Sequence, residues 1–145
     1  MKTATKILIV EHDPNDVALI ERELNKGKIN YIARVVGTRP EYETALGDFA
    51  PDIILSDYTF PSFDGPAAFK IKEELVPLIP FIYVSGTIGE ENSIQLIKNG
   101  VTDFVLKDRL FTLPVKVNRA LTEAKEKKEK IETAHALMLS ESRLA

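Results

Sequence analysis

Five short apolar runs recur along the chain, and none alternates polar with apolar residues as a strand with one solvent-exposed face does. Such runs are typical of strands that are covered on both faces, and therefore of a parallel sheet. Because segments with helical signals lie between the runs, the sequence predicts an α/β sandwich with right-handed crossovers. The expected strands are Ile7–Val10, Ile29–Val36 (interrupted), Ile53–Leu55, Phe81–Val84 and Asp103–Leu106.

The segments between the runs carry signals for helix starts and stops. Asp13 is a good capping residue, Pro14 suits the first helical position, and an acid follows three residues after the cap at Asp16. Gly27 predicts the end of this helix. Three further helices are expected: Arg39–Asp48, one that starts after Gly65, and one with Glu90 and Glu91 in its first turn and Gly100 at its end.

Length and composition narrow the class of protein. The 145 residues are a one-domain length, and 44% hydrophobic and 28% charged residues are ordinary for a soluble protein. The net charge is −3 without a basic stripe in the first hundred residues, so nucleic acid is a poor default partner. The absence of cysteine excludes disulfides and thiolate chemistry and fits a cytoplasmic location. The apolar run near the start is too short for a signal peptide or a membrane span, so no membrane contact is expected.

The last part of the chain has a different pattern. From Thr112 onward it contains one proline and no glycine, and its strong helix formers predict a helix of about 45 Å. We expect a domain over residues 1–123 and an extension of the last helix over 124–145. Two interpretations of this extension stay open: a solvated tail, or a helix that forms a homodimer or relays a signal into a downstream domain. The second rests on a 4-3 spacing, interrupted by Lys128 and His135, of Val117, Leu121, Ala124, Ile131 and Met138.

Polar residues with complementary chemistry follow four of the expected strands. In parallel α/β sheets ligands bind beyond the carboxyl ends of the strands, so these residues are expected to face one another. Carboxylates this close repel unless a cation lies between them, and hard oxygen ligands suit Mg²⁺. A lysine and a hydroxyl on the other side are what a phosphoryl group needs. The residues are Glu11, His12 and Asp13 after the first run, Asp57 after the third, Ser85 after the fourth and Lys107 after the fifth.

These motifs resemble the receiver domain of two-component signalling, the family of the chemotaxis protein that controls the bacterial flagellar motor. The resemblance covers roughly residues 6–123 and rests on "ILIVE", "PDIILSDYTFPSFDG", "VSG" and "FVLKD". It implies a doubly wound, flavodoxin-like fold with five parallel strands in the order 2-1-3-4-5. It also implies phosphoryl transfer, assisted by Mg²⁺, from the phosphohistidine of a histidine kinase or phosphotransfer domain to an aspartate.

The resemblance assigns roles to residues one by one. Asp57 matches the phosphoacceptor, Glu11 the first position of the acidic pocket, and the Thr59 carbonyl the backbone metal ligand. A carboxylate is a weak nucleophile, so its attack on phosphorus needs metal neutralisation and in-line positioning more than proton transfer. Taken alone, each of these acids could equally serve a turn, a helix cap or a solvated loop.

The remaining matches concern the response to phosphorylation. Ser85 corresponds to the switch hydroxyl that turns toward the new phosphoryl group, and Phe104 to the aromatic switch residue that moves inward with it. Lys107 resembles the lysine that pairs with the phosphoryl oxygens. In this interpretation the fragment is a phosphoacceptor with self-catalysed phosphotransfer, not a separate enzyme.

Two positions depart from the family pattern. His12 stands where the family has an aspartate that touches Mg²⁺, and imidazole suits Zn, Cu or Ni better. Asp108 stands where a proline with a cis bond is common, and we expect a trans bond because a non-proline cis bond costs about 3 kcal/mol. These departures keep an alternative function open, a degenerate receiver that serves as a phosphorylation-independent interaction module. The ending "LSESRLA" resembles linkers into a sensory PAS domain of hybrid histidine kinases, which makes such a kinase the expected parent.

Overall fold

The computed structural model describes residues 3–58, 65–86, 98 and 100–144, and it contains one parallel sheet of five strands in the order β2-β1-β3-β4-β5. The strand order expected from the resemblance is therefore confirmed, and so are the five strands, each within two residues of the expected bounds. The strands are β1 (Thr5–Val10), β2 (Tyr31–Val36), β3 (Ile53–Ser56), β4 (Phe81–Ser85) and β5 (Asp103–Leu106).

Helices connect the strands as the sequence predicts. The Asp13 carboxylate caps α1, because its Oδ1 accepts a hydrogen bond of 2.9 Å from the Asn15 backbone N–H, and Gly27 follows as the C-cap. The helix expected to start near Glu90 lies almost entirely outside the described residues. The described helices are α1 (Pro14–Lys26), α2 (Arg39–Asp48), α3 (Gly65–Leu75), the 3₁₀ turn η1 (Lys107–Thr112) and α5 (Leu113–Leu144).

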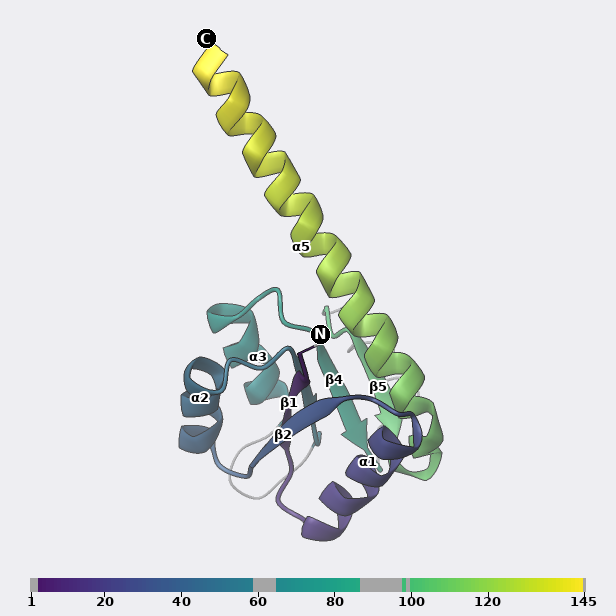
Figure 1. Cartoon of the computed structure of the whole chain (residues 1–145). Coiled ribbons are helices and arrows are strands. Elements are labelled where there is room, and N and C mark those ends of the chain that lie inside the picture. The colour runs from purple at the N-terminus through teal and green to yellow at the C-terminus, as the bar shows by residue number, and fades with distance from the viewer. Residues whose placement is uncertain (1–2, 59–64, 87–97, 99, 145) are drawn as a thin grey trace.

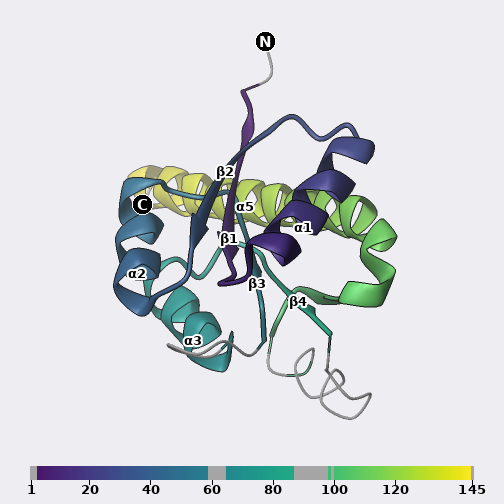
Figure 2. The same cartoon turned by 90° about the horizontal axis from the view of Figure 1, so that it is seen from below.

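The described helices cover both faces of the sheet, with α1 and α5 on one face and α2 and α3 on the other (Figures 1 and 2). Alternate residues of each strand point into one of the two resulting cores. In β1, for example, Leu8 packs with Tyr42 of α2, whereas Ile9 packs with Ile20 of α1. This explains why Ile7–Val10 of β1 is apolar without alternation, since this part of the strand is buried on both faces.

The strand register brings the chemistry-bearing residues to one edge of the sheet. Val10 pairs with Ser56, so the next residues, Glu11 and Asp57, emerge side by side from β1 and β3. The backbone continues this alignment, because the Asp57 N–H donates to the Val10 carbonyl at 2.9 Å. Two acids that are 46 positions apart in sequence therefore meet because of strand pairing alone.

The last helix extends far beyond the sheet (Figure 1). Its 32 residues correspond to about 48 Å. Val117 and Ala120 are buried against the sheet, but residues 125–141 are all exposed. Across the described residues, no helix combines the length and the apolar character needed to cross a membrane.

Gly65 begins α3 at a point where the chain approaches β4 and the end of β3 closely. A Cβ atom there would lie 2.6 Å from Tyr83 Cε1, 2.8 Å from the Asp57 carbonyl oxygen and 2.9 Å from Tyr58 Cα. Two of these three atoms are backbone and cannot move aside without moving the loop that follows Asp57. Glycine at this position is therefore a packing requirement of the edge that carries Asp57.

We predict that Gly65→Ala lowers the free energy of unfolding by about 1–3 kcal/mol, the usual cost of overpacking. Urea denaturation followed by circular dichroism measures this. Gly47→Ala is the matched control, because nothing lies within 4 Å of its Cβ position in α2. It should stabilise the protein by about 0.5–1 kcal/mol through helix propensity. Equal effects of the two substitutions would contradict the close approach at Gly65.

Candidate functional site

Two acids are buried at the carboxyl end of the sheet. The relative exposure of Glu11 is 3% and that of Asp57 is 7%. Glu11 Oε1 accepts hydrogen bonds from the backbone N–H groups of His12 at 3.0 Å and Asp13 at 3.1 Å. Asp57 Oδ1 accepts one from the Tyr58 N–H at 2.9 Å. Both carboxylates are thereby held in fixed orientations by the backbone that follows each strand.

Burial is the largest cause of a raised pKa of Glu11. The negative charge of Asp57 raises the pKa further, whereas the hydrogen bond from the Asp13 backbone and the contact with Lys107 lower it. Burial and the nearby charge of Asp57 therefore make the ionised form of Glu11 costly at this edge. A site of this kind favours a compensating positive charge.

Lys107, the first residue after β5, supplies a positive charge to the site. Its Nζ lies 2.6 Å from Asp16 Oδ2, 3.1 Å from Glu11 Oε2 and 3.7 Å from Asp57 Oδ1. Burial by itself lowers the pKa of Lys107, but the hydrogen bonds to Asp16 and Glu11 and the charges of Glu11 and Asp57 outweigh it, so the pKa is raised. The raised pKa keeps the Lys107 side chain in its protonated, positively charged form. The Lys107–Asp108 bond is trans, as expected.

Asp16 is a member of this cluster that sequence reasoning did not include. It lies in the first turn of α1, where an acid already has a local explanation in the helix dipole. Its ion pair with Lys107 joins residues 91 positions apart. The one available signal was the set of four acidic or imidazole side chains between Glu11 and Asp16, which does not specify which of them meets Lys107.

His12 lies at the rim of the site. Its side chain is 47% exposed, and its Nδ1 is 3.4 Å from Glu11 Oε1. Within the described part of the chain, one potential metal-binding group occurs, in which Glu11, His12 and Asp57 each offer an atom within 4.8 Å of the others. The two carboxylates suit a hard cation such as Mg²⁺, and the imidazole is a poorer ligand for it. The Thr59 carbonyl, the expected backbone ligand, lies outside the described residues.

The two expected switch residues lie on the neighbouring strands. Ser85 is buried at the end of β4 and pairs in register with Leu106, one residue before Lys107. Phe104 is partly buried on β5, and the Lys116 ammonium of α5 lies 5.2 Å from the centre of its ring. The same ammonium donates a hydrogen bond of 2.8 Å to the Phe104 carbonyl oxygen. Phe104 is thus in direct contact with the long helix.

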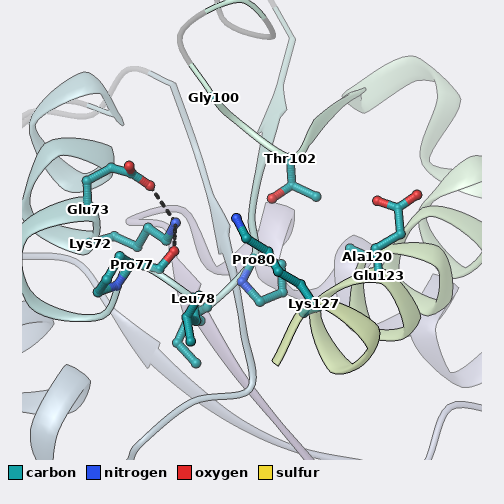
Figure 3. A pocket seen from close by; sticks show the side chains of 12 residues that line it. Lys72, Glu73, Pro77, Leu78, Pro80, Gly100, Thr102, Ala120, Glu123 and Lys127 are labelled. Atoms are coloured by element: carbon teal, nitrogen blue, oxygen red, sulfur yellow. Dashed lines mark hydrogen bonds and ion pairs between the residues drawn. The ribbon is translucent and has the colours of Figure 1, made fainter. Parts of the chain in front are cut away.

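A groove of about 470 Å³ lies away from this acidic edge, between the loop Pro77–Pro80 and α5 (Figure 3). Figure 3 shows Lys72 and Glu73 on one side of it and Glu123 of α5 on the other. Lys72 donates to Glu73 Oε1 at 2.6 Å and to the Pro77 carbonyl oxygen at 2.9 Å. The Lys72 ammonium is thus paired on its own side of the groove, and the lining residues Glu123 and Lys127 are exposed. Because the acidic edge instead holds two buried carboxylates, it is the candidate site.

A doubly wound parallel sheet with two buried acids and a lysine at its carboxyl edge defines an α/β domain of the kind that binds ligands beyond the carboxyl ends of its strands. The chain belongs to the response regulator receiver domain family, whose model matches residues 7–113.

Individual relatives agree with this family. The DNA-binding transcriptional regulator NtrC of Proteus hauseri is 26% identical over 125 residues, which are 85% of this chain and 26% of the relative. The probable C4-dicarboxylate response regulator DctR of Bacillus subtilis is 27% identical over 140 residues, 91% of this chain and 57% of the relative. The signal receiver domain of a putative Luxo repressor protein from Vibrio parahaemolyticus shares the fold, with a TM-score of 0.77 at 19% identity over 87% of this chain and 96% of that one. The chain thus spans about a quarter of the length of the first of these two curated relatives and a little more than half of the length of the second.

We predict that His12→Asp tightens Mg²⁺ binding by about 1–2 kcal/mol, or roughly five- to thirtyfold, because a carboxylate attracts a dication that a neutral imidazole does not. Titration with MgCl₂, followed by tyrosine fluorescence in a chain without tryptophan, measures the dissociation constant. His135→Asp, on the exposed part of α5, is the matched control and should leave it unchanged. An unchanged constant for His12→Asp would remove this position from the metal site.

Proposed function

We propose that this chain is a phosphoacceptor receiver in which Asp57 takes a phosphoryl group from the phosphohistidine of a histidine kinase or a phosphotransfer domain. The observation that carries the proposal is the arrangement around Asp57: a second buried carboxylate, Glu11, on one side and the Lys107 ammonium 3.7 Å away. Membership of the receiver family supports the same function. As in response regulators generally, the proposed location is the cytoplasm.

In the proposed transfer an oxygen of the Asp57 carboxylate forms a bond to phosphorus while the phosphorus–nitrogen bond of the donor histidine breaks. The carboxylates of Glu11 and Asp57, with His12 at the rim, would hold Mg²⁺. The ion, when bound, supplies positive charge that neutralises the phosphoryl oxygens. Lys107 supplies a second positive charge to the same oxygens. The buried position of Asp57 limits access of water to the acyl phosphate.

The proposed signal passes from the site into β5 and α5. Ser85 turns toward the phosphoryl group, and Phe104 moves inward with it. Because Lys116 contacts both the ring and the carbonyl of Phe104, a movement of this residue alters a direct contact of α5. Arg109, inside η1, has non-helical dihedral angles, which marks a kink between β5 and α5.

For such a signal to leave the receiver, part of the last helix must extend beyond the packed domain. We propose that residues 1–123 form the receiver and that 124–145 extend its last helix toward a downstream domain or a second copy of the chain. Supporting this, Val117 and Ala120 are buried, whereas Ile131 and Met138 are 48% and 69% exposed. The 4-3 spacing of Val117, Leu121, Ala124, Ile131 and Met138 continues one helix face past the edge of the receiver. A hybrid kinase as the parent protein stays a prediction.

A degenerate receiver is the competing proposal, and His12 is the observation that favours it. With an imidazole in place of a carboxylate, the site has one negative charge fewer for a dication. This proposal expects that Asp57 is not phosphorylated and that the domain works through its surfaces alone.

We predict that acetyl phosphate with Mg²⁺ adds one phosphoryl group to the protein, because Glu11, Asp57 and Lys107 provide both the nucleophile and the charges that the transfer needs. Intact-mass spectrometry measures the addition, which should be absent in Asp57→Asn. Asp48→Asn, an exposed acid at the end of α2, is the control and should be phosphorylated like the parent chain. If neither acetyl phosphate nor a cognate kinase labels Asp57, the degenerate receiver is the better description.

We predict that shortening the chain to residues 1–125 changes the free energy of unfolding by no more than about 0.5 kcal/mol, because residues 126–141 are all exposed. Leu113→Ala, at the buried start of α5, should instead cost about 2–5 kcal/mol. Urea denaturation measures both. A large loss of stability on shortening would place the domain boundary later than residue 123.

A further inference from the structure

The shortest contact of Lys107 is with Asp16, and not with either of the two acids at the ends of β1 and β3. Its Nζ is 2.6 Å from Asp16 Oδ2, compared with 3.1 Å to Glu11 Oε2 and 3.7 Å to Asp57 Oδ1. Only the first two of these contacts are within hydrogen-bonding distance. Lys107 is expected to pair with a phosphoryl group on Asp57. In this structure its ammonium instead donates hydrogen bonds to Asp16 and Glu11.

Other roles for the Asp16 carboxylate are filled by its neighbours. The cap of α1 is Asp13, which accepts from the Asn15 N–H at 2.9 Å. The potential metal ligands among the described residues are Glu11, His12 and Asp57, and Asp16 is not among them. What Asp16 does at the site is hold the end of the Lys107 side chain.

We propose that Asp16 is a positioning residue that holds Lys107 away from Asp57 in the unphosphorylated protein and competes with the phosphoryl group for its ammonium. The proposal rests on the proposed function of Asp57. To pair with a phosphoryl group on Asp57, the ammonium must donate to the phosphoryl oxygens in place of its present acceptors, and the short contact with Asp16 opposes this exchange. Asp16 thereby weakens the phosphorylated state and favours return of Lys107 when the phosphoryl group leaves.

The expected size of the effect follows from the exposure of the pair. The Lys107 side chain is 22% exposed and that of Asp16 is 26% exposed, so solvent screens part of their attraction. Ion pairs of this kind change an equilibrium by about two- to fivefold. An effect of that size is large enough to measure as a dissociation constant.

Beryllofluoride, which binds to the acceptor aspartate as a stable phosphoryl mimic, is the probe for the test. We expect the full chain with Asp16→Asn to bind beryllofluoride in the presence of Mg²⁺ about two- to fivefold more tightly than the parent chain. Asp16→Glu, which keeps a carboxylate, should bind as the parent does. Mg²⁺ alone should bind Asp16→Asn no more tightly than the parent chain, because Asp16 lies outside the potential metal ligands and its loss removes no charge that repels the ion.

Two further comparisons separate this role from a general loss of negative charge. Glu23→Gln removes a charge from the same helix without touching Lys107, since its contact is with Lys26 at 3.7 Å, and it should leave the affinity unchanged. In Lys107→Ala, assayed at higher beryllofluoride concentrations, Asp16→Asn should lose its effect because the group it acts through is gone. Circular dichroism verifies that each variant is folded.

The outcomes distinguish the two proposals. Binding to the parent chain with no gain in Asp16→Asn, or a gain that persists in Lys107→Ala, overturns the positioning role and leaves the phosphoacceptor intact. Failure of the parent chain and of every variant to bind beryllofluoride at saturating Mg²⁺ overturns the phosphoacceptor, and the competition for Lys107 with it. A gain that needs Lys107 and is absent in Asp16→Glu supports the proposal.

Discussion

The structure of the candidate site depends on one electrostatic constraint: two carboxylates, Glu11 and Asp57, are buried side by side at the end of a parallel sheet. Neither can move away, since backbone N–H groups hold both and the register of β1 and β3 fixes their spacing. Positive charge must come to them. In this structure Lys107 provides it, and the chemistry of the pair makes a dication the natural second source.

The same constraint connects the site to the rest of the molecule. Lys107 directly follows β5 and contacts the acids with its side chain. It is also the first residue of η1, which leads into α5. Its contact with Asp16 also ties the start of α1 to the end of β5. A change of charge at Asp57 therefore acts on a residue that lies at the junction of two helices and a strand. Bistable rearrangements are expected at such junctions, because packed elements shift between discrete arrangements.

Much of the fold was predictable from the sequence, because strands covered on both faces and helix ends leave local patterns in it. Apolar runs without alternation predicted the strands, and the cap at Asp13 with Gly27 at the other end predicted α1 correctly. The convergence of Glu11, Asp57 and Lys107 also followed, since strand ends of a parallel sheet share one edge. Asp16 was not predicted as part of this cluster, because its position in a first helical turn already had a sufficient local explanation. The roles of Ser85, Phe104 and Thr59 stay predictions.

By itself, the sequence determined the parallel sheet, both ends of α1 and the meeting of Glu11, Asp57 and Lys107 at the carboxyl edge, because periodicity and capping are local properties and strand ends share one edge. Only the tertiary structure decided how these residues are paired. It placed the Lys107 ammonium closest to Asp16, left His12 half exposed at the rim, and set Lys116 over the ring of Phe104. Such pairings depend on where long side chains from separate elements end, and therefore on packing across tens of residues, which no local pattern encodes.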